Sequence, residues 1–233
     1  MKTLYKKELN YYLNNPIGYI VAILFAVFAN FLFIKDIFVV GSASMKPFFS
    51  ILPWLYLVFV PALTMRTLSE EKRTNTMEVL LTLPVSETQI VLTKFLALST
   101  LLLIALFLTM GLPISLMFLT KLYFPEILIG YAGSLIMGAM FIAVSMVFSA
   151  FTKNQVVAFL SSVICLFIVL VLGTDFMAGV LPKTILDYLS YFTPMYHFQN
   201  FMKGVIDVRS VVYFVSALLF FLFITIVSLE KRD

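Results

Sequence analysis

The charged side chains that could bind or react gather in one stretch of the chain, between residues 66 and 94. Bases and acids alternate in this stretch, and their formal charges balance. The bases are Arg66, Lys72, Arg73 and Lys94, and the acids are Glu70, Glu71, Glu78 and Glu87. A loop that only fixes membrane topology would need bases alone, because acids contribute little to orientation. The mixed signs therefore predict a docking surface for another protein.

The same stretch contains signals for its own short helices. Two pairs, Thr67–Glu70 and Ser86–Gln89, have the spacing of a capping box, in which each side chain bonds the other residue's backbone amide. Asn75 lies between them, where a left-handed residue would end a helix. We expect a compact helix, a tight turn at Asn75, a second short helix over residues 76–83, and then re-entry into the membrane.

Several enzyme classes need residues that this sequence lacks. A phosphate-binding P-loop requires Gly followed by Lys, and none of the nine glycines is followed by Lys. A metal site needs clustered His, Cys or carboxylates, which the lone His197 and the single Cys165 do not supply. A serine protease would need Ser134 beside His197, but we place the serine in a span and the histidine in an outer loop. We therefore expect no catalytic residue, no metal and no cofactor bound by this chain.

The composition indicates the environment in which these residues must be held. Of 233 residues, 62% are hydrophobic and 12% are charged, which predicts an all-α membrane protein that crosses the bilayer several times. The net charge of +4 does not indicate nucleic-acid binding, because the bases lie at the ends of apolar runs and form no basic face.

Six apolar runs are each close to the roughly 20 residues that a spanning helix needs. They cover residues 17–34, 48–65, 95–120, 127–152, 154–173 and 210–229. Six spans place both termini on one side, and ten of the 16 Lys and Arg residues favour the cytoplasm for that side. None of the six runs contains an ionisable residue. An ion-coupled transporter normally keeps one, so the driving energy must come from a partner that docks at residues 66–94.

The remaining segments are predicted to pack around these spans. Residues 1–15 repeat apolar side chains at helical spacing opposite lysines, so we expect an interfacial helix on the lipid surface. In the fourth run, Gly130, Ser134 and Gly138 form a small-residue stripe suited to close helix packing rather than to a substrate path. Residues 174–209 are too broken to span and too apolar for water, so we expect an outer re-entrant helical hairpin.

Taken together, these residues resemble the permease subunits of ABC-2 type exporters over the whole chain. The polar stretch matches that family through EEKRTNTMEVL, from Glu70 to Leu80, and LPVS, from Leu83 to Ser86. Asn75 stands where the family usually has Gly, and both residues accept a positive φ. The opening residues 7–19 are similar to its elbow helix. The outer hairpin is matched by Pro194, His197, Phe198, Gly204, Asp207 and Arg209, although Ser210 replaces an expected Asp. Among subgroups, the chain is most similar to the gliding-motility-associated permeases.

The resemblance implies a role for the polar stretch as a coupling helix that enters a groove in an ATP-binding subunit. The residues concerned are Glu70, Glu71, Lys72, Arg73, Asn75, Thr76, Met77 and Glu78. It further implies two ATP-binding subunits, which would hold ATP and Mg²⁺, and a second permease, identical or homologous, in a bacterial cytoplasmic membrane. The transported substrate would move outward. The alternative is a membrane anchor in an ATPase-driven motility or secretion assembly that transports nothing.

Overall fold

The computed structural model describes residues 1–40, 44–77, 85–119, 123–172, 189 and 191–230, and within these ranges it contains helices and no strand. The all-α prediction is confirmed. The helices are α1 (Lys2–Asn14), α2 (Pro16–Val40), α3 (Lys46–Thr64), α4 (Ser69–Arg73), α6 (Glu87–Thr109), α7 (Gly111–Leu119), α8 (Phe124–Phe151), α9 (Gln155–Val171), α11 (Pro194–Met202) and α12 (Val208–Glu230).

Five helical segments are long and apolar enough to cross a membrane. They lie in α2, in α3 continued by α4, in α6 continued by α7, in α8 and in α12. The fifth predicted run corresponds to α9, which has 17 residues and falls below that length. At a rise of about 1.5 Å per residue, α9 is roughly 25 Å long, against about 30 Å for the hydrocarbon core. The chain is a multi-pass membrane protein, and the sixth span stays a prediction.

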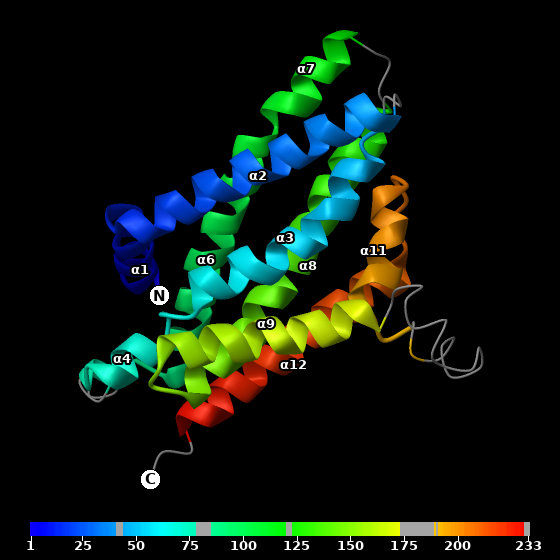
Figure 1. Cartoon of the computed structure of the whole chain (residues 1–233). Helices are drawn as coiled ribbons and strands as arrows, with labels where there is room; N and C mark the ends of the chain where they lie inside the picture. Colours follow the sequence, from blue (N-terminus) through cyan, green and yellow to red (C-terminus); the bar gives the residue numbers. More distant parts are fainter. Residues whose placement is uncertain (41–43, 78–84, 120–122, 173–188, 190, 231–233) are drawn as a thin grey trace.

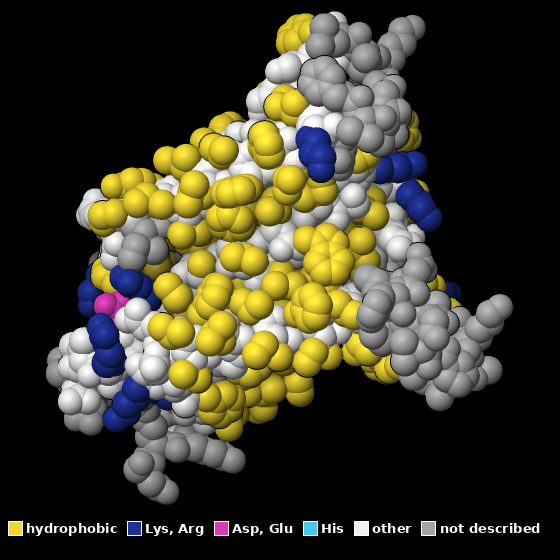
Figure 2. All heavy atoms as spheres, viewed as in Figure 1, with side chains coloured by type: hydrophobic (Ala, Val, Ile, Leu, Met, Phe, Trp, Pro, Cys, Tyr) yellow, Lys and Arg dark blue, Asp and Glu magenta, His cyan; other side chains and the backbone are white. Residues whose placement is uncertain are grey.

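The long helices extend between two ends of the molecule (Figure 1). At one end, which we call the terminal end, α1 begins, α12 finishes and α4 lies between them; α11 lies at the opposite, far end. Apolar side chains cover the middle of the face in Figure 2, while Lys and Arg lie toward the two ends. This distribution is the one expected when the middle contacts lipid and both ends contact water.

The centre of the bundle is α8, which packs against α3, α6, α9, α11 and α12. The small-residue stripe lies on its buried surface. A Cβ at Gly130 would come within 2.3 Å of the Phe49 ring in α3, and a Cβ at Gly138 within 2.4 Å of Leu102 in α6. The Ser134 hydroxyl donates to the Gly130 carbonyl at 2.7 Å. Larger residues at the two glycines would therefore push neighbouring helices away from α8.

The third predicted run differs from the structure at both ends. It is divided into α6, which ends at Thr109, and α7, which begins at Gly111. Pro113 has no N–H to donate to the Thr109 carbonyl, so the helical hydrogen bonding is interrupted there. Its beginning is also earlier than predicted, since α6 starts at Glu87 rather than near residue 95. Lys94 consequently lies inside α6 rather than just before it, in a helix that is long and apolar enough to cross a membrane.

Candidate functional site

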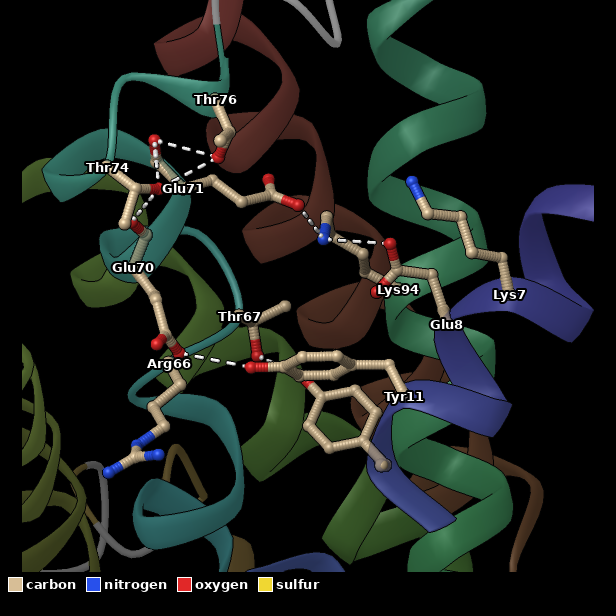
Figure 3. Close-up of a pocket in the computed structure, with 11 residues that line it drawn as sticks. Lys7, Glu8, Tyr11, Arg66, Thr67, Glu70, Glu71, Thr74, Thr76 and Lys94 are labelled. Carbon is tan, nitrogen blue, oxygen red and sulfur yellow. Dashed lines mark hydrogen bonds and ion pairs between the residues drawn. The ribbon is translucent and has the colours of Figure 1, made fainter. Parts of the chain in front are cut away.

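Lys94 joins three helices at the terminal end (Figure 3). Its ammonium nitrogen lies 3.1 Å from Oε1 of Glu8 in α1 and 2.7 Å from Oε1 of Glu71 in α4. The Lys94 side chain is 4% exposed, and those of Glu8 and Glu71 are 10% and 22% exposed. A buried ammonium costs several kcal/mol of desolvation unless opposite charges surround it, so the three residues depend on one another. We call Glu8, Glu71 and Lys94 the Lys94 junction.

The position of Lys94 follows from where α6 starts. The Ser86 side chain accepts a hydrogen bond from the Gln89 amide at 3.3 Å, so this predicted helix start is confirmed. Lys94 then falls on the inward face of α6, one turn after the buried Ile90 and one turn before the buried Leu98. Glu87 in the first turn also suits the positive end of the helix dipole.

The other predicted capping pair is wrong. The helix α4 begins at Ser69, and Thr67 does not cap it; the Thr67 hydroxyl instead shares a 3.0 Å hydrogen bond with the Tyr12 hydroxyl of α1. The amides of Leu68 and Ser69 donate to Oγ of Ser149 at 3.1 and 3.2 Å. Ser149 lies near the end of α8, so a distant helix supplies the cap that the local sequence does not.

Tyrosines of α1 make further hydrogen bonds to this region. The Tyr11 hydroxyl donates to Oε2 of Glu70 at 3.2 Å, and the Tyr5 hydroxyl shares a 2.8 Å hydrogen bond with Thr100 of α6. Burial raises the pKa of Tyr12 to about 12, although the positive charge of Lys94 opposes the rise. Burial and the neighbouring Glu70 carboxylate likewise raise the pKa of Tyr11. Both phenols are therefore neutral at physiological pH, so the Tyr11 hydroxyl keeps the proton that it donates to Glu70.

Asn75 has a φ of 56°, so the predicted left-handed turn is confirmed. Thr76 and Met77 after it are helical, while Glu78 and the rest of the predicted second helix lie outside the described residues. The hydroxyl of Thr74 shares a 2.9 Å hydrogen bond with that of Thr76 across the turn. Residues 73–76 are exposed, and Met77 is buried.

The structure divides the predicted coupling residues into two groups. Glu71 and Lys72 bond inward, Glu71 to Lys94 and the Lys72 ammonium to the Ala150 carbonyl at the end of α8. The exposed group comprises Arg73, Asn75 and Thr76. Glu70 is half-buried and bonded to Tyr11. Among these residues, the exposed group presents side chains that a partner could reach without breaking an ion pair or a contact to another helix of the described chain.

A cavity of about 530 Å³ lies beside the Lys94 junction, between α1 and α4. Its charged lining comprises Lys7, Glu8, Arg66, Glu70, Glu71 and Lys94. In Figure 3 the Lys94 ammonium lies between the carboxylates of Glu8 and Glu71, and Tyr11 points toward Glu70. Three bases and three acids in one cavity make it a polar site at the end of an otherwise apolar bundle.

The residues predicted for the outer hairpin lie at the far end. Pro194, His197 and Phe198 are buried in α11, and Gly204 after it has a φ of 74°. A Cβ at Gly204 would lie 3.1 Å from the backbone of Glu126, so this turn packs directly against the start of α8. Most of residues 174–190 lie outside the described residues, so the re-entrant hairpin stays a prediction.

His197 is held by hydrogen bonds to uncharged groups. Its Nε2 donates to the Tyr191 carbonyl at 2.8 Å, because a carbonyl can only accept, and its Nδ1 lies 3.3 Å from the Ser210 hydroxyl. The ring stacks on Tyr213 with centroids 4.1 Å apart. We call these four residues the His197 cap. Since Ser134 donates to Gly130 instead, the structure does not pair Ser134 with His197, and the protease hypothesis loses its geometric basis.

At the same end, Asp207 and Arg209 form a local turn before α12. The Arg209 amide donates to Oδ1 of Asp207 at 3.0 Å, and the Asn200 side chain donates to Oδ2 at 3.3 Å. The Ser210 hydroxyl, at the position where an Asp was expected, accepts from Asn200 at 3.4 Å. These contacts fix the direction in which α12 leaves α11.

The sequence analysis did not identify Glu8 or Ser149. Glu8 is four residues after Leu4 and four before Tyr12, which places it on the apolar face of α1. An acid on such a face needs a cation, and that signal could have identified Glu8 before the structure did. Ser149 offers no comparable signal, because its partners are 80 and 81 residues away.

Comparison with known proteins gives one match and one negative result. The family model for ABC-2 family transporter protein matches residues 6–229, which include every residue of the Lys94 junction and of the His197 cap. A search of curated proteins finds no match. In the part of the chain that the structure describes, no three His, Cys, Asp or Glu side chains lie together as a metal site would require.

Proposed function

The chain belongs to the ABC-2 family of transporter membrane proteins, and on that premise we propose that it is the permease subunit of an ATP-driven exporter. The terminal end faces the cytoplasm of a bacterial cell, and the substrate moves outward. ATP and Mg²⁺ bind to a separate ATP-binding subunit. Two permeases, identical or homologous, assemble with two such subunits.

The exposed turn at residues 73–76 is the proposed docking point for the ATP-binding subunit. It lies at the terminal end, and it combines one cation, Arg73, with three small hydrogen-bonding side chains. Arg73 presents a planar fork of donors that suits a carboxylate on the partner. The left-handed Asn75 makes the turn tight enough to project from the surface of the permease.

Movement at this turn would reach the spans through contacts within the permease. Glu71 connects α4 to α6 through Lys94, and Ser149 connects the start of α4 to the end of α8. A displacement of α4 therefore moves the ends of two spanning helices together, and α8 contacts most of the remaining helices. The Glu71–Lys94 ion pair is the single observation on which the proposal chiefly rests.

The test is a charge reversal at the exposed turn. Arg73→Glu should weaken association of the purified permease with its ATP-binding subunit about tenfold, since one rim charge pair contributes on the order of 1.4 kcal/mol. The effect should shrink as salt is raised. Association is measured by co-purification titration, and coupling by the ATPase rate of the reconstituted complex.

Lys203→Glu is the matched control, because Lys203 is an exposed base at the end of α11, at the far end of the molecule. It should leave association unchanged. Equal effects of the two reversals, or no effect of Arg73→Glu, would place the docking point elsewhere. The anchor alternative uses the same docking point, and no contact among the described residues favours it over transport.

A further inference from the structure

A second cavity lies where the end of α4 meets the connection between α8 and α9. Its volume is about 330 Å³, and it is lined by Arg73, Lys153, Asn154, Gln155 and Val156. Two of these five residues are cations, and they come from segments that are far apart in the sequence. We call this cavity the Arg73–Lys153 pocket.

Hydrogen bonds hold the two sides of the pocket together. The Lys72 ammonium donates to the Ala150 carbonyl at the end of α8, and the start of α4 is bonded to the same end of α8 through Ser149. The helix α4 also contacts α9. Arg73 directly follows Lys72, and Lys153 lies shortly after Ala150, so these bonds keep both cations beside one space. The pocket is therefore preformed and needs no rearrangement to receive a ligand.

The charges that line the pocket indicate a missing anion. Neither Arg73 nor Lys153 forms an ion pair with a described residue. The two acids of α4 are engaged elsewhere, Glu70 with Tyr11 and Glu71 with Lys94.

The start of α9 adds the positive end of its helix dipole to the same space. Like charges that share a pocket repel each other, so an anion between them would be bound favourably. Both cations are exposed, and an anion can therefore reach them from outside the chain.

We propose that one acidic side chain of the ATP-binding subunit enters the Arg73–Lys153 pocket and bonds both cations. This inference rests on the proposed function, and it extends the docking surface from the turn to the connection between α8 and α9. A carboxylate has two oxygens, so it can accept from the Arg73 guanidinium and from the Lys153 ammonium at once. Since Lys153 lies between α8 and α9, the partner then acts on α4, α8 and α9 together.

A lipid phosphate is the competing anion. Val156 in the pocket is exposed, and Leu160 and Ile164 continue an exposed apolar stripe along the same face of α9, where an acyl chain could lie. The carboxylate of a partner is favoured because Arg73 also belongs to the proposed docking turn. The pocket thus adjoins the surface that the ATP-binding subunit would cover.

The experiment is zero-length cross-linking of the purified complex between the full-length chain and its ATP-binding subunit. A carbodiimide activates a carboxylate so that a lysine amine in contact with it forms an amide bond, while the reagent leaves as its urea. We expect mass spectrometry to find Lys153 joined to one acidic residue of the partner. The variant Arg73→Lys should add a cross-link from position 73 to that same acidic residue. Lys203 at the far end is the control and should form no cross-link to the partner.

A second arm measures association by co-purification titration. Lys153→Glu should weaken association about tenfold, as expected for loss of one charge pair at the rim of an interface. Replacement of the cross-linked partner acid by Lys should restore association to both Lys153→Glu and Arg73→Glu. Lys203→Glu should leave association unchanged. All variants are compared only when they elute as the wild type does on size exclusion.

The outcomes separate this inference from the proposed function. If the wild-type complex does not form, the proposed function fails and this inference fails with it. If the complex forms and Arg73→Glu weakens it while Lys153→Glu does not, this inference alone is overturned. Cross-links from positions 73 and 153 to different partner acids would also overturn it, because the two cations would not share one carboxylate. Reduced retention of phosphatidylglycerol by Lys153→Glu in native mass spectrometry, with unchanged partner association, would assign the pocket to a lipid instead.

Discussion

The Lys94 junction and the His197 cap attach short helices to the bundle by different means. The junction uses full charges and connects distant segments, with Glu8 and Lys94 separated by 86 residues and Glu71 and Lys94 by 23. The cap uses hydrogen bonds from an imidazole ring to uncharged groups, with Tyr191 and Ser210 only 6 and 13 residues from His197. One is therefore a long-range closure of the fold, and the other is a local arrangement within residues 191–213.

This difference affects what each region can transmit. A buried ion network fails as a whole when one member is lost, because the remaining charges stay buried without compensation. A neutral network loses single hydrogen bonds and keeps its packing, here the stack of His197 on Tyr213. A displacement of α4 is thus felt directly by α1 and α6, while a change at His197 stays close to α11 and the start of α12.

The largest effect is expected from Lys94→Met, which removes the cation that, among the described residues, contacts the two carboxylates of the junction. The substitution preserves much of the side-chain volume and leaves Glu8 and Glu71 buried as like charges. We expect a loss of about 3–5 kcal/mol in the free energy of unfolding, as for other broken buried ion pairs. Thermal unfolding of the full chain in detergent measures the change.

A charge-neutral triple variant is the matched control for this prediction. Combining Lys94→Met with Glu8→Gln and Glu71→Gln removes the like charges, so most of the lost stability should return. Equal instability of the single and triple variants would show that the packing of Lys94 matters and its charge does not. The comparison between the two regions would then lose its basis.

The contrast between the regions also explains what could be predicted from sequence. The apolar runs, the Ser86 helix start and the turn at Asn75 each depend on neighbours within a few residues, and the sequence pattern identifies them. The cap on α4 could not be found in this way, because Ser149 comes from another helix. The Thr67–Glu70 pair was wrong for the same reason, since Tyr12 competes for the Thr67 hydroxyl.

The exposed residues of the predicted docking stretch lie at the surface, and the buried ones have a partner that the sequence analysis did not identify. The acids and bases of residues 66–94 form a polar site, but its buried half includes Glu8 from the start of the chain. Starting the third span near residue 95 placed Lys94 outside the membrane helix. Local composition favours that position, whereas the start of α6 at Glu87 and the carboxylates of two other helices place Lys94 inside it.

A smaller and more local effect is expected from His197→Phe at the far end. Phenylalanine keeps the stack on Tyr213 and removes the hydrogen bonds to the Tyr191 carbonyl and the Ser210 hydroxyl. We expect the free energy of unfolding to fall by about 1–3 kcal/mol, the usual cost of leaving a buried acceptor unpaired. Hydrogen exchange should increase in α11 and the start of α12, and should not change in α1 and α4.

Gln199→Ala is the matched control for the cap, because Gln199 is exposed two residues further along α11. It should leave exchange rates nearly unchanged. If His197→Phe increased exchange in α1 or α4 as much as in α11, the cap would not be local. The two ends of the molecule would then be coupled as tightly as the helices of the Lys94 junction.

The smallest effect is expected from Tyr12→Phe, which removes the hydrogen bond to Thr67 and leaves the Lys94 junction intact. The loss in the free energy of unfolding should be about 1 kcal/mol near neutral pH.

Burial raises the pKa of Tyr12 to about 12, against about 10 for an unperturbed tyrosine, so folding favours the neutral phenol. Its contribution is complete below about pH 10 and is lost as the pH rises through about 12. The stability difference between wild type and Tyr12→Phe should therefore shrink across this interval, as measured by thermal unfolding at a series of pH values. Tyr123→Phe, at an exposed tyrosine outside the junction, serves as the control. A constant difference between wild type and Tyr12→Phe up to pH 12 would mean that the phenol is not held neutral by burial, and that α1 attaches through its ion pair alone.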